Sequence, residues 1–341
     1  MKNSSFITSD KILNKPKKAE MRGNLMTLDN IKEEILNSRN IVILTHEVPD
    51  GDAIGSSLAM YLALKQIGKE VDVLSSKVPK VYNFLPSIDV IKQDGNIDNY
   101  DLAIALDCGD IRRLNGFSNY FEDANCRISI DHHEANTMFA DYNFVNPTAP
   151  ACSQILITVL KELGIEITKE IGTCLLTGII TDTGGFKYQN VTAETFEFAA
   201  ELLSKGVNVS DIFRRVMQSI PKEKFELKKI ATDRIELLEN GKIAFTYITR
   251  KDEEQTKCDD HDGIVEIGRD IEGVEVSIFL RELDKNNYKI SLRSNDYVNV
   301  SDICLMFNGG GHIRAAGGSI NGLPLEKAKE KLVLECKKNL K

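Results

Sequence analysis

Short apolar runs alternate with longer stretches of helical periodicity over the first two thirds of the chain. Buried strands are predicted at 41–44, 71–74, 102–106 and 127–130. Helices are predicted at 55–67, 151–163, 168–180 and 193–205. Because buried strands that alternate with helices are typical of a parallel sheet, this pattern predicts an α/β domain with helices on both faces of the sheet.

The pattern changes in the last third, where it predicts a smaller α+β domain. Strands are predicted at 242–249, 274–281 and 288–293, and a terminal helix from Pro324. Pro221 opens a segment rich in lysine and glutamate, which predicts a connecting helix, and Thr27 is the expected N-cap of the first helix. The expected organisation is a basic flexible extension at 1–25, a first domain at 26–218, a connecting helix at 219–238 and a second domain at 239–341.

Composition and charge exclude several classes of protein. The 341 residues contain seven cysteines, an odd number without a CxxC pair, which favours reduced thiols over a disulfide scaffold or a zinc finger. The formal net charge of −8 argues against binding long nucleic acid through the overall field of the molecule. No apolar run approaches the ~20 residues that span a bilayer, and no secretory h-region is present. We therefore expect a cytoplasmic protein without a membrane partner.

The first candidate site follows the first predicted strand. His46, Asp50 and Asp52 lie in one strand-to-helix loop, and α/β proteins place ligands at this edge of the sheet. Pro49 and Gly51 restrict the loop, so the three side chains can converge. Taken alone, the motif is equally consistent with a solvated acidic turn.

Three more acidic positions follow predicted strands or helices in the same manner. Asp107 ends the third strand, Asp131, His132 and His133 end the fourth, and Asp182 ends an apolar helix. Asp107 could also be an N-cap, and Asp182 could form an Asx-turn. Two consecutive histidines behind an aspartate have few purely structural uses.

Together these positions predict a metal centre. Several carboxylates that share one crevice need a cation, because burying them unpaired costs many kcal/mol. Carboxylate and imidazole ligands without thiolates favour manganese, with magnesium or cobalt as substitutes, and the ligand number suits two ions. Two such ions are typical of phosphoester hydrolysis. The candidate metal ligands are His46, Asp50, Asp52, Asp107, His132 and Asp182.

In order and spacing, these motifs resemble those of the DHH phosphoesterase family. Residues 291–294 (SLRS) and 309–317 (GGGHIRAAG) resemble the associated DHHA1 substrate-binding domain. The resemblance implies a DHH catalytic, metal-binding domain at 26–218 and a DHHA1 domain at 239–341. The length and the second domain favour the stand-alone type, which acts as a nano-RNase and as a phosphatase.

The resemblance also implies a role for each residue of the first domain. His46 and Asp50 would hold one Mn²⁺, a second group of ligands would hold the other, and Asp107 would bridge the two ions. Asp131 would support the histidine pair, and His133 would face the scissile phosphate. The second group of ligands comprises Asp52, His132 and Asp182.

In the second domain the resemblance implies contacts to substrate. Arg293 and Ser294 would bind a phosphate, while His312 and the backbone amides of Gly310 and Gly311 would hold another part of the nucleotide. Glycine lets backbone N–H groups approach an anion closely.

The expected function is Mn²⁺-dependent hydrolysis of short oligoribonucleotides to mononucleotides and of 3'-phosphoadenosine 5'-phosphate (pAp) to AMP. The alternatives are a phosphodiesterase for cyclic di-AMP or pApA, and a catalytically silent protein that binds metal and nucleotide. Short RNA and small nucleotides are the expected partners, and long duplex nucleic acid is not expected to bind. The sequence leaves open whether the protein forms a homodimer.

Overall fold

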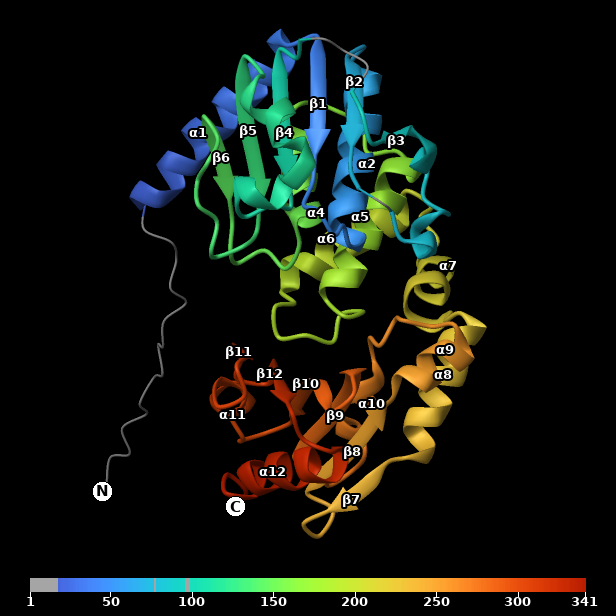
Figure 1. Cartoon of the computed structure of the whole chain (residues 1–341). Helices are drawn as coiled ribbons and strands as arrows, with labels where there is room; N and C mark the ends of the chain where they lie inside the picture. Colours follow the sequence, from blue (N-terminus) through green and yellow to red (C-terminus); the bar gives the residue numbers. More distant parts are fainter. Residues whose placement is uncertain (1–17, 77, 96–98) are drawn as a thin grey trace, which may run out of the picture. The chain divides into compact units, whose positions relative to one another are not determined.

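A computed structural model describes residues 18–76, 78–95 and 99–341, and the chain divides into two compact units (Figure 1). The first unit ends at Ser219 and the second begins at Ile220. Of the predicted extension, residues 1–17 lie outside the described residues. Among the residues that are described, no helix is both long and apolar enough to span a bilayer.

The first unit is an α/β domain whose strands are short and largely buried. Its strands are β1 (Asn40–Leu44), β2 (Glu70–Leu74), β3 (Ile91–Lys92), β4 (Leu102–Leu106), β5 (Cys126–Asp131) and β6 (Tyr142–Val145). Its helices are α1 (Lys18–Asn37), α2 (Gly51–Gln66), η1 (Lys80–Tyr82), η2 (Ile88–Val90), η3 (Ile111–Phe117), α3 (Ser118–Glu122), α4 (Cys152–Glu162), α5 (Lys169–Asp182), α6 (Ala193–Ser204), α7 (Val209–Phe213) and η4 (Arg214–Gln218).

All neighbouring strands of this sheet are parallel, in the order β3-β2-β1-β4-β5-β6. The chain builds the sheet outward from β1 in one direction and then outward from β4 in the other. The carboxyl ends of β1 and β4 therefore form the switch point at which open α/β sheets bind their ligands. This confirms the predicted fold class.

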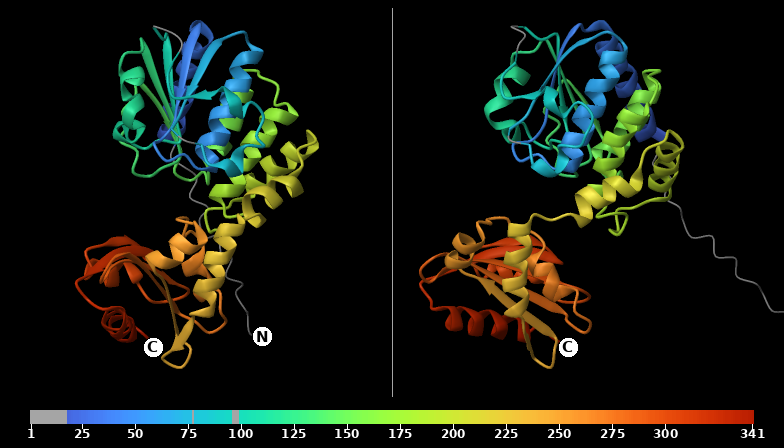
Figure 2. Two further views of the ribbon diagram at one scale, coloured as in Figure 1. Left: turned by 45° about the vertical axis from the view of Figure 1, so that its right-hand side comes forward. Right: turned by 90° about the vertical axis from the view of Figure 1, so that its right-hand side faces the viewer.

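Helices cover both faces of the sheet (Figures 1 and 2). On one face, Ile43 of β1 belongs to a core with Leu58 of α2 and Leu175 of α5. On the other face, Val42 belongs to a core with Phe121 of α3. All five side chains are fully buried, and each contributes about 1.5–3 kcal/mol through removal of apolar surface from water. Adjacent residues of β1 thus serve opposite cores, as the period of a strand requires.

The first helix begins earlier than its sequence pattern predicts. We expected an N-cap at Thr27, whereas α1 starts at Lys18 and continues through that residue. Leu28 and Ile31, the first apolar positions of the predicted period, are buried as expected. A cap signal can be overridden when good helix formers precede it, and alanine, glutamate, methionine and arginine occur between 18 and 26.

The second unit is an α+β domain with one mixed sheet, in the order β11-β12-β10-β9-β8-β7. Only the β8–β9 pair is parallel. The strands are β7 (Glu236–Leu238), β8 (Ile243–Ile248), β9 (Val276–Asp284), β10 (Asn287–Ser294), β11 (Gly310–His312) and β12 (Ala315–Asn321). The helices are α8 (Lys222–Asp233), α9 (Arg250–Thr256), α10 (Ile264–Arg269), α11 (Val300–Leu305) and α12 (Leu325–Lys337).

The segment 219–238 differs from the expected connecting helix. Helix α8 ends at Asp233, and the strand β7 follows and pairs with β8. Leu227 and Ala231 of α8 are fully buried in a core of the second unit with Phe279 of β9. The helix is therefore part of the second domain, because its apolar stripe packs on that domain's sheet.

Candidate metal centre

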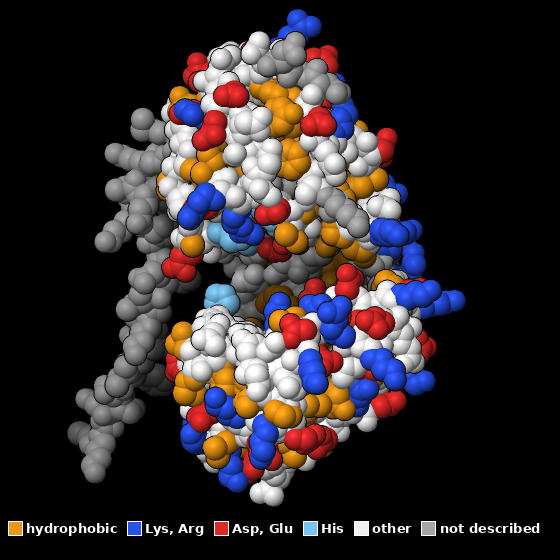
Figure 3. All heavy atoms as spheres, viewed as in Figure 1, with side chains coloured by type: hydrophobic (Ala, Val, Ile, Leu, Met, Phe, Trp, Pro, Cys, Tyr) orange, Lys and Arg blue, Asp and Glu red, His pale blue; other side chains and the backbone are white. Residues whose placement is uncertain are grey.

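Loops at the carboxyl ends of three parallel strands carry the predicted ligands. His46 follows β1, Asp107 follows β4, and His132 follows β5. The backbone at Asp107 is left-handed, with φ +54°, a conformation that aspartate tolerates better than most residues. In the space-filling view, histidine, acidic and basic side chains gather at this edge of the first unit (Figure 3).

The first group of possible ligands comprises His46, Asp50 and Asp107, whose ligand atoms all lie within 4.8 Å of one another. His46 Nε2 is 3.6 Å from Asp107 Oδ2 and 3.9 Å from Asp50 Oδ2. The other oxygen of Asp50, Oδ1, caps α2 by accepting the N–H groups of Asp52 and Ala53 at 3.0 and 3.1 Å. Asp50 thus has one oxygen bound to the helix and one oriented toward His46.

The second group comprises Asp52, His132 and Asp182, again within 4.8 Å. His132 Nε2 lies 3.3 Å from Asp182 Oδ2 and 4.0 Å from Asp52 Oδ2. It also lies 3.3 Å from Oδ1 of Asp107, the carboxylate whose other oxygen faces His46. All six side chains that the sequence singles out are therefore brought together, with Asp107 between the two groups.

Asp52 has a second role that the sequence did not reveal. Its fully buried carboxylate accepts the backbone N–H of Cys152 at 2.6 Å and that of Ser153 at 2.9 Å, so it binds the N-terminus of α4. The positive end of the helix dipole also stabilises this negative charge. These contacts join residues about 100 positions apart, so no local motif could have indicated them.

Close packing of α2 against α5 brings the acidic residues of the two helices together. A Cβ atom on Gly178 of α5 would lie 2.5 Å from Asp52 Oδ1 and would collide with the hydroxyl of Ser153. A Cβ atom on Gly55 of α2 would lie 2.5 Å from the carbonyl oxygen of Cys174. Glycine is required at both positions by this close approach of the two helices.

The buried charges shift one another's protonation. Burial raises the pKa of Asp52 to about 7 and that of Asp182 to about 9, and neighbouring carboxylates add to both shifts. Burial acts to lower the pKa of His132, but Asp107 and the other two carboxylates outweigh it and raise this pKa to about 10. Burial acts to raise the pKa of Asp107, yet the imidazoles of His132 and His46 hold it below its usual range. Without a cation, the cluster therefore retains protons.

The donor set fits divalent cations. Among the described residues, Asp107 Oδ1 and His46 Nδ1 are buried side-chain atoms that lack a hydrogen-bond partner. Unsatisfied buried polar atoms are costly, and a bound ion would compensate the carboxylate. Oxygen and imidazole ligands without a thiolate suit Mn²⁺ or Mg²⁺ better than a structural zinc ion.

Asp131 orients His133 and contributes no atom to the two groups above. Asp131 Oδ1 is 2.8 Å from His133 Nδ1, while its Oδ2 accepts the Asn136 side-chain N–H at 2.7 Å. The hydrogen bond to Asp131 raises the pKa of His133, which favours the imidazolium form. His133 is about one third exposed, so its outer nitrogen is accessible to a substrate.

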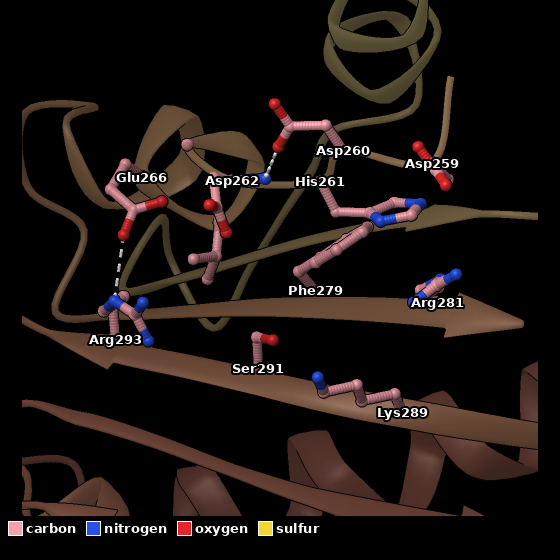
Figure 4. A pocket seen from close by; sticks show the side chains of 12 residues that line it. Asp259, Asp260, His261, Asp262, Glu266, Phe279, Arg281, Lys289, Ser291 and Arg293 are labelled. Atoms are coloured by element: carbon pink, nitrogen blue, oxygen red, sulfur yellow. Dashed lines mark hydrogen bonds and ion pairs between the residues drawn. The ribbon is translucent and has the colours of Figure 1, made fainter. Parts of the chain in front are cut away.

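In the second unit, Arg293 lines a cavity of about 300 Å³ on the sheet face of β9 and β10 (Figure 4). Lys289 and Ser291 line it from the same strand; Lys289 was not singled out from the sequence, and Ser291 was given only as part of the motif 291–294, without a role. Their period of two predicts that they share a face with Arg293. Arg293 Nε donates to Glu266 Oε1 at 2.9 Å.

The placement of Ser294 differs from its expected role in binding a substrate phosphate. Its side chain is buried, and its hydroxyl donates to the carbonyl oxygen of Val298 at 2.6 Å. This serine lies on the face of β10 opposite to Arg293, because neighbouring residues of a strand alternate. The cavity-facing hydroxyl of this strand belongs to Ser291.

The glycine motif forms strand β11, which pairs with β12. A Cβ atom on Gly309 would collide with the carbonyl oxygen of Gly317, and one on Gly311 would lie 2.6 Å from the carbonyl oxygen of Ala315. Packing against β12 therefore explains these two glycines without a ligand. His312 is exposed at the end of β11, and Asn308 adopts a left-handed conformation with φ +51°, which asparagine tolerates.

Comparison with known proteins places this geometry in a family. Residues 40–179 match the N-terminal domain of the DHH family, and residues 240–340 match the DHHA1 domain. The chain is 35% identical over 306 residues to the bifunctional oligoribonuclease and PAP phosphatase NrnA of Thermus thermophilus, covering 88% of this chain and 90% of the relative.

Solved structures share the fold. An exopolyphosphatase-related protein from Bacteroides fragilis has a TM-score of 0.81 at 29% identity, covering 91% of this chain and 96% of that one. RecJ from Thermus thermophilus, solved in complex with Mn²⁺, has a TM-score of 0.50 at 15% identity, covering 96% of this chain and 56% of that one. From the domain matches and the 35% identity, the chain belongs to the DHH family and carries its DHHA1 domain.

Proposed function

We propose that this protein is a manganese-dependent phosphoesterase that hydrolyses short oligoribonucleotides to mononucleotides and pAp to AMP. The broader class follows from the family and its relatives: the chain is a hydrolase of phosphoester bonds. The observation that carries the finer proposal is the pair of ligand groups that meet at Asp107. The Thermus relative is named for the same two activities.

The ligand groups divide into two sites for divalent cations. His46 and Asp50 would hold one ion, Asp107 would bridge, and the remaining group would hold the other. When bound, the ions supply a water of lowered pKa and neutralise charge on the phosphoryl group, as in-line hydrolysis requires. The remaining group comprises Asp52, His132 and Asp182.

His133 is the proposed proton donor to the leaving oxygen. Asp131 binds Nδ1 at 2.8 Å, which leaves Nε2 as the nitrogen that can contact a substrate. The hydrogen bond to Asp131 raises the pKa of His133 and so favours the protonated imidazole that a general acid requires. The carboxylate also restrains the ring, so that little orientational freedom is lost in the reaction.

The DHHA1 domain would bind the nucleotide away from the bond that breaks. Arg293 offers a guanidinium whose Nε is already held by Glu266, and planar donor groups of this kind suit phosphate oxygens. Gly310 and Gly311 lie in β11, the edge strand next to β12, in which alternate backbone N–H groups face away from β12 and can donate to a ligand, and the exposed His312 ends this strand.

The test is to measure kcat/KM of the Mn²⁺-loaded protein on pAp, pApA, a short RNA, cyclic di-AMP and pyrophosphate. The proposal predicts the highest values for short RNA and pAp. A clear preference for cyclic di-AMP would contradict it in favour of a cyclic dinucleotide phosphodiesterase, and a preference for pApA over other dinucleotides would favour a pApA hydrolase. Absence of any hydrolysis would indicate a silent binding protein.

Variants separate the two domains in the same assay. Arg293→Ala and His312→Ala should lower kcat/KM about tenfold or more, since each removes a contact to a phosphate or nucleoside. The Mn²⁺ content should stay at the wild-type value, because neither residue belongs to the ligand groups. Loss of metal from either variant would contradict these assignments.

A further inference from the structure

An exposed aromatic side chain lies close to the end of α5, where Asp182 is located. Tyr188 is 58% exposed. Its ring lies against Gly184, where an added Cβ atom would collide with three of the ring carbons. Gly184 in turn donates its N–H to the carbonyl oxygen of Thr181, within the last turn of α5. The Tyr188 ring therefore packs against the turn at the end of α5 that contains the proposed metal ligand Asp182.

The residues just before this tyrosine adopt a conformation that is costly for one of them. Gly184, Gly185 and Phe186 are consecutive left-handed residues, with φ of +56°, +72° and +62°. A phenylalanine in this region is a rare outlier, and such strain persists only where the surroundings enforce it. Here the Phe186 N–H donates to Thr183 Oγ1 at 3.0 Å, and the ring stacks on Phe196 of α6 at 5.3 Å between centroids.

Two further hydrogen bonds fix the loop next to the metal centre. The backbone N–H of Tyr188 donates to the carbonyl oxygen of Thr183 at 3.1 Å. The side-chain N–H of Asn190 donates to the carbonyl oxygen of Asp182 at 3.2 Å. The tyrosine is thus held at a defined place while its ring stays exposed, so a ligand could stack on it at little cost in conformational entropy.

Other loops of the metal centre also present apolar side chains. Val48, between His46 and Asp50, is 78% exposed, and Met138, after the histidine pair, is 57% exposed. The segments that follow β1, β5 and α5 therefore each present an exposed side chain with a large apolar part beside the ligands. A ligand that places a phosphoester at the metal centre and an apolar ring on the rim would match both features.

We propose that Tyr188 is a stacking platform for a nucleobase of the substrate whose phosphoester lies at the metal centre. This inference rests on the proposed function and adds a base-binding subsite to it. Tyr188 positions the substrate and takes no part in proton transfer. Because every nucleobase has a π-face, stacking of this kind is tolerant of sequence. The subsite should therefore bind all four bases with similar strength.

The experiment compares pApA with an analogue that has the same phosphodiester but lacks both bases. Tyr188→Ala should raise KM for pApA about tenfold with kcat nearly unchanged, the typical loss for one base–aromatic stack. Tyr188→Phe should keep the wild-type KM, since stacking needs the ring and not the hydroxyl. For the analogue without bases, the wild type and Tyr188→Ala should have equal KM values.

Phe225→Ala provides a matched control, because this phenylalanine is 55% exposed on α8 of the second unit. It should leave both KM values unchanged. The proposal is overturned if Tyr188→Ala keeps the wild-type KM for pApA, raises KM equally on the analogue, or loses Mn²⁺. In each of these cases the proposed function still stands, since wild-type hydrolysis of pApA is measured alongside. Failure of the wild type to hydrolyse any nucleotide would instead contradict the function itself.

Discussion

Asp107 connects the two ligand groups through its two carboxylate oxygens. Oδ2 faces His46 at 3.6 Å, and Oδ1 faces His132 at 3.3 Å. The residue is buried and directly follows β4, and its backbone is left-handed, with φ +54°. A side chain in this position can ligate two ions at once, because each of its oxygens faces a different group.

Asp107→Asn should abolish hydrolysis of every substrate, with a loss of at least about 10³-fold in kcat. Asparagine tolerates the same φ and has nearly the same shape, so the change removes charge without introducing backbone strain. Elemental analysis of Mn²⁺-loaded protein should find two ions per wild-type chain and fewer in the variant. Asp123→Asn, an exposed position beside α3, is the control and should be neutral. If the variant kept a tenth of the activity, the activation barrier would have risen by only about 1.4 kcal/mol, which would contradict the proposal that Asp107 bridges the two ions.

The shifted carboxyl groups predict that the metal-free protein loses stability as the pH rises. Asp52 and Asp182, with pKa values of about 7 and about 9, keep protons in the folded state at pH values where the unfolded chain has released them. The unfolded state then binds fewer protons, so the free energy of unfolding falls as the pH rises through this range. The raised pKa of His132 also contributes. This histidine stabilises the folded state most below pH 6.5, its pKa in the unfolded chain, and the stabilisation is lost as the pH rises toward about 10.

Thermal melts of EDTA-treated protein between about pH 5 and about pH 8 should therefore show a midpoint that decreases with pH. Asp182→Asn should flatten this dependence, since it removes the group with the highest carboxyl pKa. Saturating Mn²⁺ should reverse the trend in the wild type, because binding a metal ion displaces protons and becomes tighter as the pH rises. A metal-free midpoint that increases with pH would show that the cluster is ionised without a cation.

At the scale of elements, the contact between α2 and α5 determines where the acidic residues meet. Gly178→Ala should displace the Asp52 carboxylate, because the new methyl group would occupy the space of Asp52 Oδ1 and of the Ser153 hydroxyl. We expect the affinity for Mn²⁺, measured by calorimetric titration, to fall at least about tenfold. Mutations of residues that hold a metal ligand in place typically have an effect of this size.

Gly172→Ala on the same helix is the matched control. Its new methyl group would meet methyl groups of Val207 at 2.8 Å and Leu202 at 3.4 Å and no residue of the acidic cluster, and alanine favours a helix over glycine by about 1 kcal/mol. This variant should keep its Mn²⁺ affinity. Equal affinity in Gly178→Ala would show that Asp52 tolerates displacement, and an equal loss in both variants would indicate a general disturbance of α5.

The elements that the sequence predicted are those with a strong local pattern. The four predicted strands of the first unit correspond to β1, β2, β4 and β5, and each of them ends in at least three consecutive buried residues. Strand β6 (Tyr142–Val145) was missed because all of its residues are only partly buried and no continuous apolar run marks it. The histidines and aspartates were found because each lies at or near the end of a strand or helix.

What the sequence could not reveal depends on long-range packing. The contacts of Asp52 with α4 and the glycine requirement at Gly178 arise from helices that meet only in the folded unit. The inward orientation of Ser294 depends on which face of β10 its own domain covers. None of these follows from a period or a motif, because each needs the identity of the partner element.

At the scale of the whole molecule, charge predicts a preference for short substrates. The chain has 43 basic and 51 acidic side chains, so its overall field repels a long polyanion, and binding must depend on local contacts. In the cavity of the second unit, the two arginines are already paired, Arg281 with Glu253 and Arg293 with Glu266. Few cations are therefore left there to follow an extended phosphate backbone.

We expect kcat/KM for pApA and other short oligoribonucleotides to exceed that for a long single-stranded RNA by about tenfold or more. Raising the salt concentration should reduce this ratio, because screening weakens the repulsion that the longer polyanion experiences. The released products should be mononucleotides, as measured by chromatography of samples taken over the course of the reaction. Equal efficiency on long strands that are degraded processively would contradict the charge argument and would indicate a general exonuclease. The affinity of such an enzyme for long RNA should fall steeply with salt, because its phosphate contacts are lost.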